Sequence, residues 1–450
     1  MKILLKNAMI LTMNDRREVY RQGNILIEKD CITRIGHFEA PTDCDEVMDC
    51  TRKTIMPGLV NTHTHTSQQL ARGLADDVDL LTWLRDRIWP YESNMTEEDS
   101  YISTLLFCVE QIKAGCTSIA EPGGQFVSGM ARAITEAGIR GKLAKSTMDC
   151  GEGLPKNWQH TTDEELSIQE EDLKKYHNTA DGRVKIWFGI RTIFNATDEL
   201  LLRTKELADK YGVGVHMHIA EARSEVEYAK ATRGCTTVTH LNNLGFLDKN
   251  ILAAHAVWLT NEEVQMFKDH GVKVSHNPAS AMRVLGFAKI PRMLREGVCV
   301  ALGTDGTPTN NRMNMVDEMW VTSLIHKGWR LEPDVVKAQE ILAMATINGA
   351  EALGEKDLYG SLEEGKKADL ILIDPNLNAD MLPVHDPIAN LVTSMHSTNI
   401  THTMCDGKWL MKDRHLLTLD EAAILKAGRE HAEAICRRGG ISLPDRMPML

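Results

Sequence analysis

Two histidines one residue apart give the first chemical signal in this chain. His63 and His65 follow directly after the apolar run Ile55–Asn61. A β-strand turns alternate side chains to the same face, so residues i and i+2 leave its end together. If the run is a strand, the two imidazoles lie close enough to bind one metal ion. Two histidines on a solvated strand end are the simpler alternative, and the rest of the chain decides between them.

Further polar residues stand at or just after the ends of other apolar runs. They are His218, Glu221, His255, His276 and Asp305. Each alone has an ordinary explanation as a rim histidine, a helix cap or the start of a turn. Active sites of parallel barrels lie at the carboxyl ends of the strands, however. Polar residues at five different strand ends therefore predict a catalytic site, in which three imidazoles and a carboxylate bind a metal and leave room for water.

The fifth run leaves one ambiguity, because His216 and His218 are also spaced i and i+2. His218 lies nearer the strand end, so we predict that it is the ligand and that His216 lies deeper and is hydrogen-bonded, with a supporting role as the alternative. A two-metal site normally needs a carboxylated lysine at the end of the fourth run. Lys185 stands too early in that run and Arg191 follows its end. The pattern therefore favours one metal.

Eight short apolar runs must position these residues. They are Ile55–Asn61, Thr117–Glu121, Lys142–Thr147, Val184–Ile190, Gly212–His218, Ile251–His255, Val272–His276 and Val298–Thr304. Their nearly continuous apolar character is typical of parallel strands covered on both faces. Helical patterns lie between them, including Asp198–Tyr211, a helix opened by the capping box Thr260–Glu263, and Ile290–Glu296. The alternation predicts an α/β fold, a (β/α)₈ TIM-like barrel.

The two ends of the chain have short strand-like runs and no long helix before the last one. We predict that residues 1–55 and 361–417 pair into a small β-sandwich beside a barrel of residues 56–360. Residues 418–450 form a last helix and a tail: the helix starts at the capping box Thr418–Glu421 and runs to about Arg438. The tail after Gly440 is predicted to be an arm on this or a neighbouring subunit.

Composition excludes several classes of protein. A chain of 450 residues with a net charge of −12 is not expected to bind nucleic acid or an anionic membrane as its main partner. The chain contains no run of about 18 apolar residues, so no membrane span is predicted. The first residues do not resemble a signal peptide. The ten cysteines form no C-x-x-C pair, which is typical of a reduced, cytoplasmic enzyme. We expect a homo-oligomer, a dimer or a tetramer.

Several motifs together resemble the amidohydrolase superfamily. They are P-G-L-V-N-T-H-T-H ending at His65, H-x-x-E from His218, the histidine at 255, S-H-N-P-A-S around His276, and G-T-D-G around Asp305. The chain is most similar to the aminohydrolase branch, which contains S-adenosylhomocysteine/methylthioadenosine deaminases, guanine deaminases and triazine hydrolases. The resemblance covers nearly the whole chain, and it implies a hydrolase that acts on C–N bonds in cyclic amidines.

The resemblance also implies roles for individual residues. His63, His65, His218 and Asp305 would bind one divalent metal, Zn²⁺ first and Fe²⁺ as the alternative. Glu221 and His255 would be the acid–base pair, with Asp305 sharing the proton transfer. Trp83, Arg191 and His276 would contact a flat heterocyclic substrate.

Two substrate classes stay open on the sequence. Adenosine-type compounds, such as S-adenosylhomocysteine and methylthioadenosine, are the first prediction, with ammonia released. Nucleoside deaminases of this branch carry a histidine after the fourth strand, where this chain has Arg191, and an acidic residue before the tryptophan, where it has Thr82. Arg191 could bind a carbonyl-rich or anionic ring, or it could be a structural ion-pair partner. The alternative function is a triazine- or pterin-type hydrolase that removes chloride, an alkylamine or ammonia. A non-catalytic barrel would typically lack metal ligands, and this chain has all four.

Overall fold

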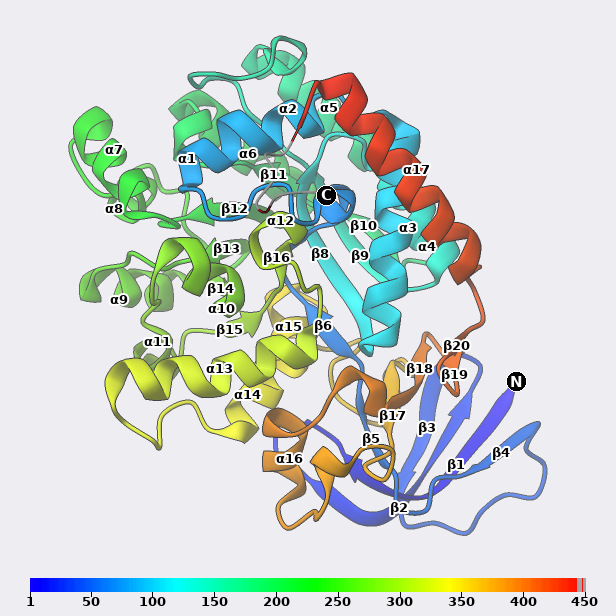
Figure 1. The fold of residues 1–450 in the computed structure, drawn as a ribbon. Helices are drawn as coiled ribbons and strands as arrows, with labels where there is room; N and C mark the ends of the chain where they lie inside the picture. Colours follow the sequence, from blue (N-terminus) through cyan, green and yellow to red (C-terminus); the bar gives the residue numbers. More distant parts are fainter. Residues whose placement is uncertain (443–446, 448–450) are drawn as a thin grey trace.

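Strands from both ends of the chain meet in one mixed sheet (Figure 1). The computed structural model describes residues 1–442 and 447. Within them this end sheet has nine strands: β1 (Lys2–Leu11), β2 (Val19–Glu28), β3 (Cys31–Gly36), β4 (Glu46–Asp49), β5 (Thr54–Pro57), β17 (Leu370–Ile373), β18 (Ile400–Cys405), β19 (Lys408–Lys412) and β20 (His415–Leu416). β17 pairs antiparallel with β5, with Ile371 opposite Met56. The predicted strand-like runs at the two ends therefore share backbone hydrogen bonds.

The middle of the chain forms two parallel sheets. One contains β6 (Leu59–Asn61), β8 (Cys116–Gly124), β9 (Arg140–Lys145) and β10 (Val184–Ile186). The other contains β11 (Phe188–Ile190), β12 (Val215–Ile219), β13 (Ile251–His255), β14 (Lys273–His276) and β15 (Val300–Leu302). Backbone hydrogen bonds join the edges of the two sheets. The Trp187 N–H donates to the Leu143 carbonyl (3.0 Å), and the Thr62 N–H donates to the Leu302 carbonyl (2.9 Å). The predicted α/β class is confirmed.

Each predicted run contains a strand, but two of the runs are broken. The first divides at Gly58 into β5, which belongs to the end sheet, and β6, which pairs with β8. The fourth divides at Trp187 into β10, which pairs with β9, and β11, which pairs with β12. In both cases the apolar pattern continues through the break, because β5, β6 and β11 are buried on both faces and only Lys185 of β10 is half-buried. The apolar pattern of the sequence therefore does not show where a strand changes its hydrogen-bonding partner.

Helices cover the parallel strands, and three of them have the predicted bounds or caps. α6 (Asp198–Tyr211) and α11 (Ile290–Glu296) match the prediction, and α9 (Asn261–His270) opens with the capping box of Thr260 and Glu263. The others that bear on the site or flank the strands are α2 (Trp89–Glu92), α3 (Glu97–Lys113), α4 (Val127–Ala137), α5 (Thr162–Tyr176), α7 (Arg223–Arg233), α8 (Thr237–Asn243), α13 (Met315–Arg330), α14 (Ala338–Met344) and α15 (Ile347–Ala352).

The last helix starts later than predicted. α17 (Glu421–Gly439) is capped by Asp420, whose carboxylate accepts from the Ala423 N–H (3.0 Å). The predicted capping box at Thr418 is wrong, because the Thr418 hydroxyl instead donates to the carbonyl of Ala137 (2.9 Å). The predicted arm after Gly440 lies almost wholly outside the described residues.

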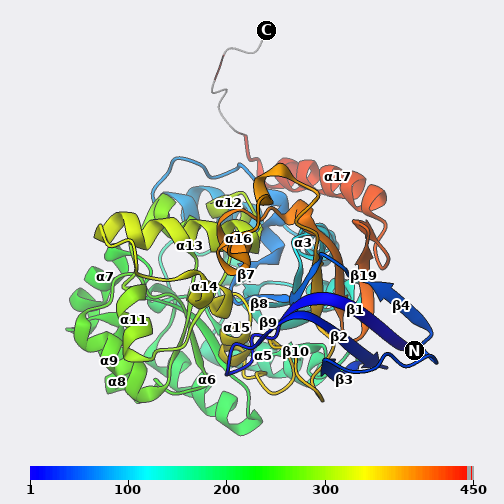
Figure 2. The same ribbon diagram turned by 90° about the horizontal axis from the view of Figure 1, so that it is seen from below.

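The end sheet and the rim helices lie on opposite sides of the parallel strands. In Figures 1 and 2, α7, α8 and α9 are on one side and β1 to β4 are on the other. α17 packs along α3. Of the helices in residues 1–442, none is long and apolar enough to cross a membrane.

The break at Gly58 generates a testable prediction. A Cβ atom there would lie 2.3 Å from Cγ2 and Oγ1 of Thr117, which is buried. Gly58→Ala should therefore destabilise the fold by about 1–3 kcal/mol through overpacking, seen as a lower melting temperature. The matched control is Gly328→Ala on the exposed face of α13, where a Cβ meets nothing within 4 Å. It should leave the melting temperature unchanged or raise it. Equal melting temperatures for both variants would contradict the close approach.

Candidate metal centre and active site

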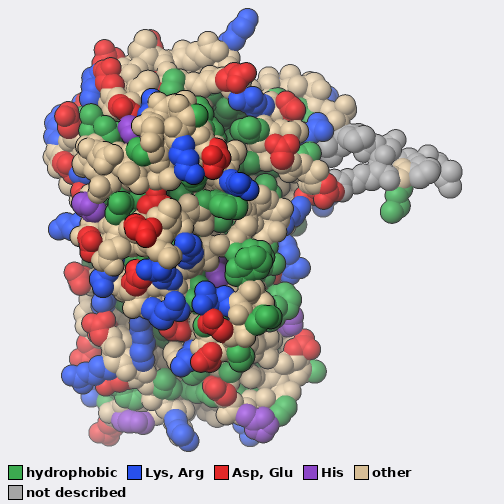
Figure 3. Space-filling model, turned by 90° about the vertical axis from the view of Figure 1, so that its left-hand side faces the viewer, with side chains coloured by type: hydrophobic (Ala, Val, Ile, Leu, Met, Phe, Trp, Pro, Cys, Tyr) green, Lys and Arg blue, Asp and Glu red, His purple; other side chains and the backbone are tan. Residues whose placement is uncertain are grey.

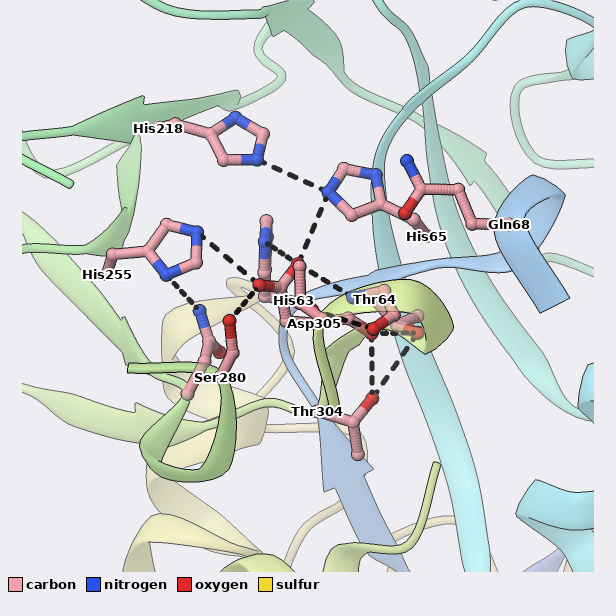
Figure 4. A network of polar contacts seen from close by, with 12 residues as sticks. His63, Thr64, His65, Gln68, His218, His255, Ser280, Thr304 and Asp305 are labelled. Carbon is pink, nitrogen blue, oxygen red and sulfur yellow. Dashed lines mark hydrogen bonds and ion pairs between the residues drawn. The ribbon is translucent and has the colours of Figure 1, made fainter. Parts of the chain in front are cut away.

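The first and last parallel strands are linked by a short ladder that brings two histidines to Asp305. β7 (Thr64–His65) pairs parallel with β16 (Asp305–Gly306), and the Asp305 N–H donates to the His63 carbonyl (2.9 Å). The Nε2 atoms of His63 and His65 lie 3.4 and 3.5 Å from Oδ1 of Asp305. The Ser280 hydroxyl donates to Oδ2 of the same carboxylate (2.5 Å). The carboxylate is thereby held with Oδ1 toward the imidazoles (Figure 4).

Two more histidines join this cluster from neighbouring strands. His218 on β12 places Nε2 3.3 Å from Nε2 of His65. His255 at the end of β13 places Nε2 4.0 Å from Oδ2 of Asp305. His218 and His255 come from adjacent, hydrogen-bonded strands, and their rings stack with centroids 5.4 Å apart. The structure thus brings together five of the residues that the strand-end pattern selected, His63, His65, His218, His255 and Asp305 (Figure 4).

Hydrogen bonds on the far side of each ring set which nitrogen faces the cluster. Nδ1 of His218 lies 2.8 Å from the Arg191 carbonyl. Because a carbonyl only accepts, Nδ1 donates and Nε2 is left with its lone pair toward the centre. Nδ1 of His255 instead accepts from the Asn277 amide (3.1 Å), so the neutral ring carries its proton on Nε2. Nδ1 of His63 contacts Nε2 of His216 (3.0 Å), which places His216 behind a ligand candidate.

The charges at the cluster follow from burial. Desolvation lowers the pKa of His63 and His218, and it lowers the pKa of His255 to about 3. Burial acts in the opposite sense on Asp305, but the nearby imidazoles of His63, His255 and His65 hold its pKa well below the ordinary value. The cluster therefore offers neutral nitrogen donors around one carboxylate.

This donor set fits a divalent cation. The candidate ligand atoms of His63, His65 and Asp305 lie within 4.8 Å of one another. Nitrogens of His63, His218 and His255 lie equally close together, and that of His255 carries a proton. Within the described part of the chain, Nε2 of His63 and of His255 are buried and have no hydrogen-bond partner. A buried polar atom without a partner is costly, so atoms of this kind facing one point indicate a group that binds there. Imidazole with carboxylate is a ligand set typical of zinc and of other divalent transition metals.

Glu221 lies next to this cluster at the turn after β12. Its Oε1 is 3.6 Å from Nε2 of His255, and its side chain is 13% exposed. Burial, with the negative charges of Asp305 and Glu225, raises the pKa of Glu221 to about 8. The carboxylate of Glu225 accepts from the N–H groups of Ala220 (2.8 Å) and Glu221 (2.7 Å), which fixes the turn. A protonated carboxyl in this position can donate a proton at neutral pH.

Three residues of the site were missed by the sequence prediction. Glu121 at the end of β8 accepts from the N–H groups of Thr66 and Gly123, and its Oε1 lies 3.6 Å from Nδ1 of His65. Its place at the end of a predicted strand was a usable signal. Glu92 on α2 is buried, and its Oε1 accepts from the amide of Gln68 (3.0 Å). Burial raises the pKa of Glu92, while Arg191 and His65 act to lower it. No sequence pattern marked Glu92 or Gln68.

The three residues predicted to contact the substrate lie in different surroundings. Arg191 is buried, and its guanidinium has no ion pair or hydrogen bond to a side chain or carbonyl of residues 1–442, so the structural ion-pair alternative is wrong. Trp83 is buried in an apolar cluster and its indole N–H points to the carbonyl of Pro308 (3.5 Å), just after Asp305. His276 is turned away from the cluster: its Nε2 contacts Nε2 of His326 on α13 (3.0 Å).

Comparisons with known proteins agree with this geometry. A family model described as "Amidohydrolase family" matches residues 54–410. A 5′-deoxyadenosine deaminase of Methanobrevibacter smithii is 40% identical over 435 residues, which cover 96% of this chain and 98% of the relative. A 5-methylthioadenosine/S-adenosylhomocysteine deaminase of Syntrophomonas wolfei is 37% identical, with 97% and 99% covered.

A solved structure of an adenosine deaminase from Xanthomonas campestris, with bound zinc, aligns with a TM-score of 0.91 at 27% identity, with 97% and 98% covered. An α/β fold with a buried site for a divalent metal and a matching family model define the class of the protein as a hydrolase. The chain belongs to the amidohydrolase family, and the resemblance seen in its motifs is confirmed.

The ligand cluster predicts the metal content. Purified protein should contain about one divalent metal ion per chain by elemental analysis, and His63→Asn should lower that content severalfold, because an N-donor at the centre of both ligand groups is lost. His276→Asn is the matched control: it removes an equally buried histidine that lies outside the cluster. Retention of metal by His63→Asn, or equal loss in the control, would contradict the assignment. Two metals per chain, both needed for activity, would overturn the one-metal prediction.

Proposed function

We propose that this chain is a hydrolytic deaminase that releases ammonia from the adenine ring of an adenosine-type nucleoside. The observation that carries the proposal is the largely buried Glu221, whose pKa is raised to about 8, placed 3.6 Å from His255 and beside a histidine–aspartate cluster that could hold a metal. Relatives at 34–40% identity whose names are deaminases of 5′-deoxyadenosine and of methylthioadenosine or S-adenosylhomocysteine support it. The reaction replaces the ring C–NH₂ by C=O, with water as the co-substrate and ammonia as the product.

His63, His65, His218 and Asp305 would hold the metal, and we propose Zn²⁺, with Fe²⁺ as the alternative. A divalent ion in such a site lowers the pKa of a bound water to about 7 and polarises the substrate. The residues around it then handle protons. Glu221 donates a proton to the ring nitrogen next to the reacting carbon. His255 keeps Nε2–H pointed at Asp305 and Glu221, because Nδ1 accepts from Asn277, so it can pass a proton toward the leaving amine.

Two buried ionisable side chains of opposite type, Arg191 and Glu92, would bind the polar groups of the substrate away from the reacting carbon. Arg191 has a buried guanidinium without a partner, and Glu92 has one carboxylate oxygen, Oε2, without a hydrogen bond among the described residues. The two groups influence each other electrostatically but form no ion pair. A ligand with acceptor atoms for Arg191 and hydroxyl donors for Glu92 satisfies both. A nucleoside, with ring nitrogens and ribose hydroxyls, has this combination.

An apolar cavity over the same loops suits the 5′ end of such a nucleoside. It has a volume of about 670 Å³ and is lined by side chains from the loops after β6, β9, β11 and β12, with Leu81, Leu84, Trp89, Phe194 and Tyr228 among them. The cation in its lining, Arg85, already pairs with Glu152 (3.2 Å). We therefore propose uncharged 5′ groups as preferred substituents.

The finer architecture is part of the proposal. Hydrogen bonds at both edges of the two parallel sheets support a closed (β/α)₈ barrel of residues 56–360. Pairing of β5 with β17 supports a β-sandwich of residues 1–55 and 361–417, followed by the segment 418–450. Ten free cysteines support a cytoplasmic location. The homo-oligomeric state stays a prediction.

The substrate test measures ammonia released by metal-loaded protein from 5′-deoxyadenosine, methylthioadenosine, S-adenosylhomocysteine and adenosine. We expect the highest kcat/KM with the first two, because their 5′ groups are uncharged and apolar. An aminopterin and a chlorotriazine are included as alternatives. Release of chloride or an alkylamine, without ammonia from any nucleoside, would overturn the proposal in favour of a triazine-type hydrolase.

Glu221→Gln tests the proton donor. We expect normal metal content and a loss of kcat of roughly 10²–10⁴-fold, since the amide keeps the shape but cannot transfer the proton. The matched control is Glu430→Gln on α17, an exposed glutamate that does not line the apolar cavity, which should retain wild-type kcat. If Glu221→Gln loses its metal, the division between ligand and acid is wrong.

Arg191→Ala tests the substrate contact. The Arg191 carbonyl that holds His218 stays in place, so the metal site should be retained. We expect KM for the best nucleoside to rise by roughly 10-fold, the scale of one lost charge-assisted hydrogen bond. Arg191→Lys should recover part of the loss because it restores the charge. An unchanged KM in Arg191→Ala would show that the guanidinium does not touch the substrate.

A further inference from the structure

A second hollow lies on the outer rim, away from the metal cluster. Its volume is about 1060 Å³, and its lining comes from α7, the starts of α9 and α11, and the end of α13. Figure 3 views the side of the molecule that carries these helices, where Lys and Arg side chains lie among hydrophobic and acidic side chains. None of the residues proposed for catalysis or metal binding is among those that line it.

The lining is cationic, although the whole chain carries a net charge of −12. Six lysines and arginines line the hollow against two glutamates: Arg223, Lys230, Lys289, Arg292, Arg295 and Arg330 against Glu227 and Glu262. Some of these cations are neutralised, such as Arg292 by Glu296 (2.6 Å).

Three of these cations are left without a carboxylate. In residues 1–442, Arg223 and Arg295 have neither an ion pair nor a hydrogen bond through their side chains, and Lys289 donates only to the amide oxygen of Asn261 (3.0 Å). Lys289 and Glu262 influence each other electrostatically but form no ion pair. Like charges that converge on one hollow in excess of its carboxylates repel each other, and an anionic ligand relieves that repulsion. The cations thus point to an anion with several negative oxygens.

Aromatic side chains stand exposed beside these cations. Trp258, Phe287 and Trp329 are 40%, 39% and 64% exposed, which is unusual for large apolar side chains gathered in one place. The rings of Phe287 and Trp329 are stacked, with centroids 4.2 Å apart and an angle of 11°. The indole N–H of Trp258 donates to the Leu285 carbonyl (2.9 Å), which fixes that ring. These contacts hold flat aromatic faces at the edge of the hollow.

We propose that this hollow binds a nucleoside di- or triphosphate. The base would stack on the exposed aromatic faces, and the phosphates would pair with Arg223, Lys289 and Arg295. The volume is in the range of pockets that hold small-molecule ligands, so one free nucleotide fits better than a chain of nucleic acid. The site is separate from the deaminase centre, and its occupancy does not depend on the function proposed above.

The hollow is also connected to the catalytic residues by contacts. His326 is part of its lining and contacts His276 (3.0 Å), and the next residue, Asn277, holds Nδ1 of His255 (3.1 Å). A nucleotide in the hollow is therefore within a short series of contacts of the proposed acid–base histidine.

The test is calorimetric titration of the metal-loaded, full-length protein with inosine 5′-triphosphate. Its base has no amino group and cannot be deaminated. Saturating inosine is present to occupy the metal centre. We expect a Kd below about 1 mM, at least tenfold weaker binding by the Arg223→Ala/Arg295→Ala double variant, and weaker binding by Trp329→Ala. Inorganic triphosphate should bind less tightly than the nucleotide, because it cannot stack.

Matched controls keep the result interpretable. Arg429→Ala removes an exposed arginine on α17, and Trp320→Ala removes an exposed tryptophan on α13 that does not line the hollow. Both should bind like the wild type. No binding at millimolar nucleotide, displacement by inosine, or equal weakening in the controls would overturn the proposal. Triphosphate that binds as tightly as the nucleotide would overturn the assignment of a base-binding face.

Discussion

The structure depends on holding buried imidazoles neutral beside one ionised carboxylate. Burial takes away the water that would stabilise a charged ring, which lowers the pKa of His63, His218 and His255. A neutral imidazole has one donor and one acceptor, and both need partners when water is excluded. His216, the Arg191 carbonyl and Asn277 supply the partners on the far side. The near sides are then free to face the centre of the cluster. The hydrogen bonds on the far sides determine which near-side nitrogens have a free lone pair and which carry a proton.

These partners come from distant parts of the chain. The Thr64 hydroxyl donates to the Asp305 carbonyl across a sequence separation of 241 residues, and the Asn61 amide donates to Thr304 across 243. The ligand cluster therefore forms only when the first and last parallel strands have met. Such non-local contacts are slow to form, because the chain entropy is lost before the contact stabilises anything. His255 and Asp305 also have left-handed backbones (φ 72° and 62°), which non-glycine residues rarely adopt and which the surrounding contacts maintain.

The site was predictable from the sequence to the extent that strand periodicity determines it. An i, i+2 spacing at a strand end was enough to predict that His63 and His65 lie together, and position at a strand end was enough to place His218, Glu221, His255 and Asp305 beside them; their roles stay predictions. The same rule failed to foresee where His276 points, because a strand end places a residue at the mouth but does not determine what packs against it, here His326. Glu92 lies on a helical segment without a periodic signal. The breaks at Gly58 and Trp187 depend on which strands pair with each other. The apolar pattern of a single run does not determine this pairing.

The short passage from the end sheet to the parallel sheet has a consequence for how such proteins can be recombined. One residue, Gly58, separates β5 from β6, and His63 follows β6 by two positions. β5 is at the same time hydrogen-bonded between β1 and β17. The end sheet is therefore a fixed anchor for the strand that carries His63 and not a detachable module. A crossover between two relatives in this stretch would exchange the anchor of the candidate metal ligands together with the sheet, so viable chimaeras should keep both ends of the chain from one parent.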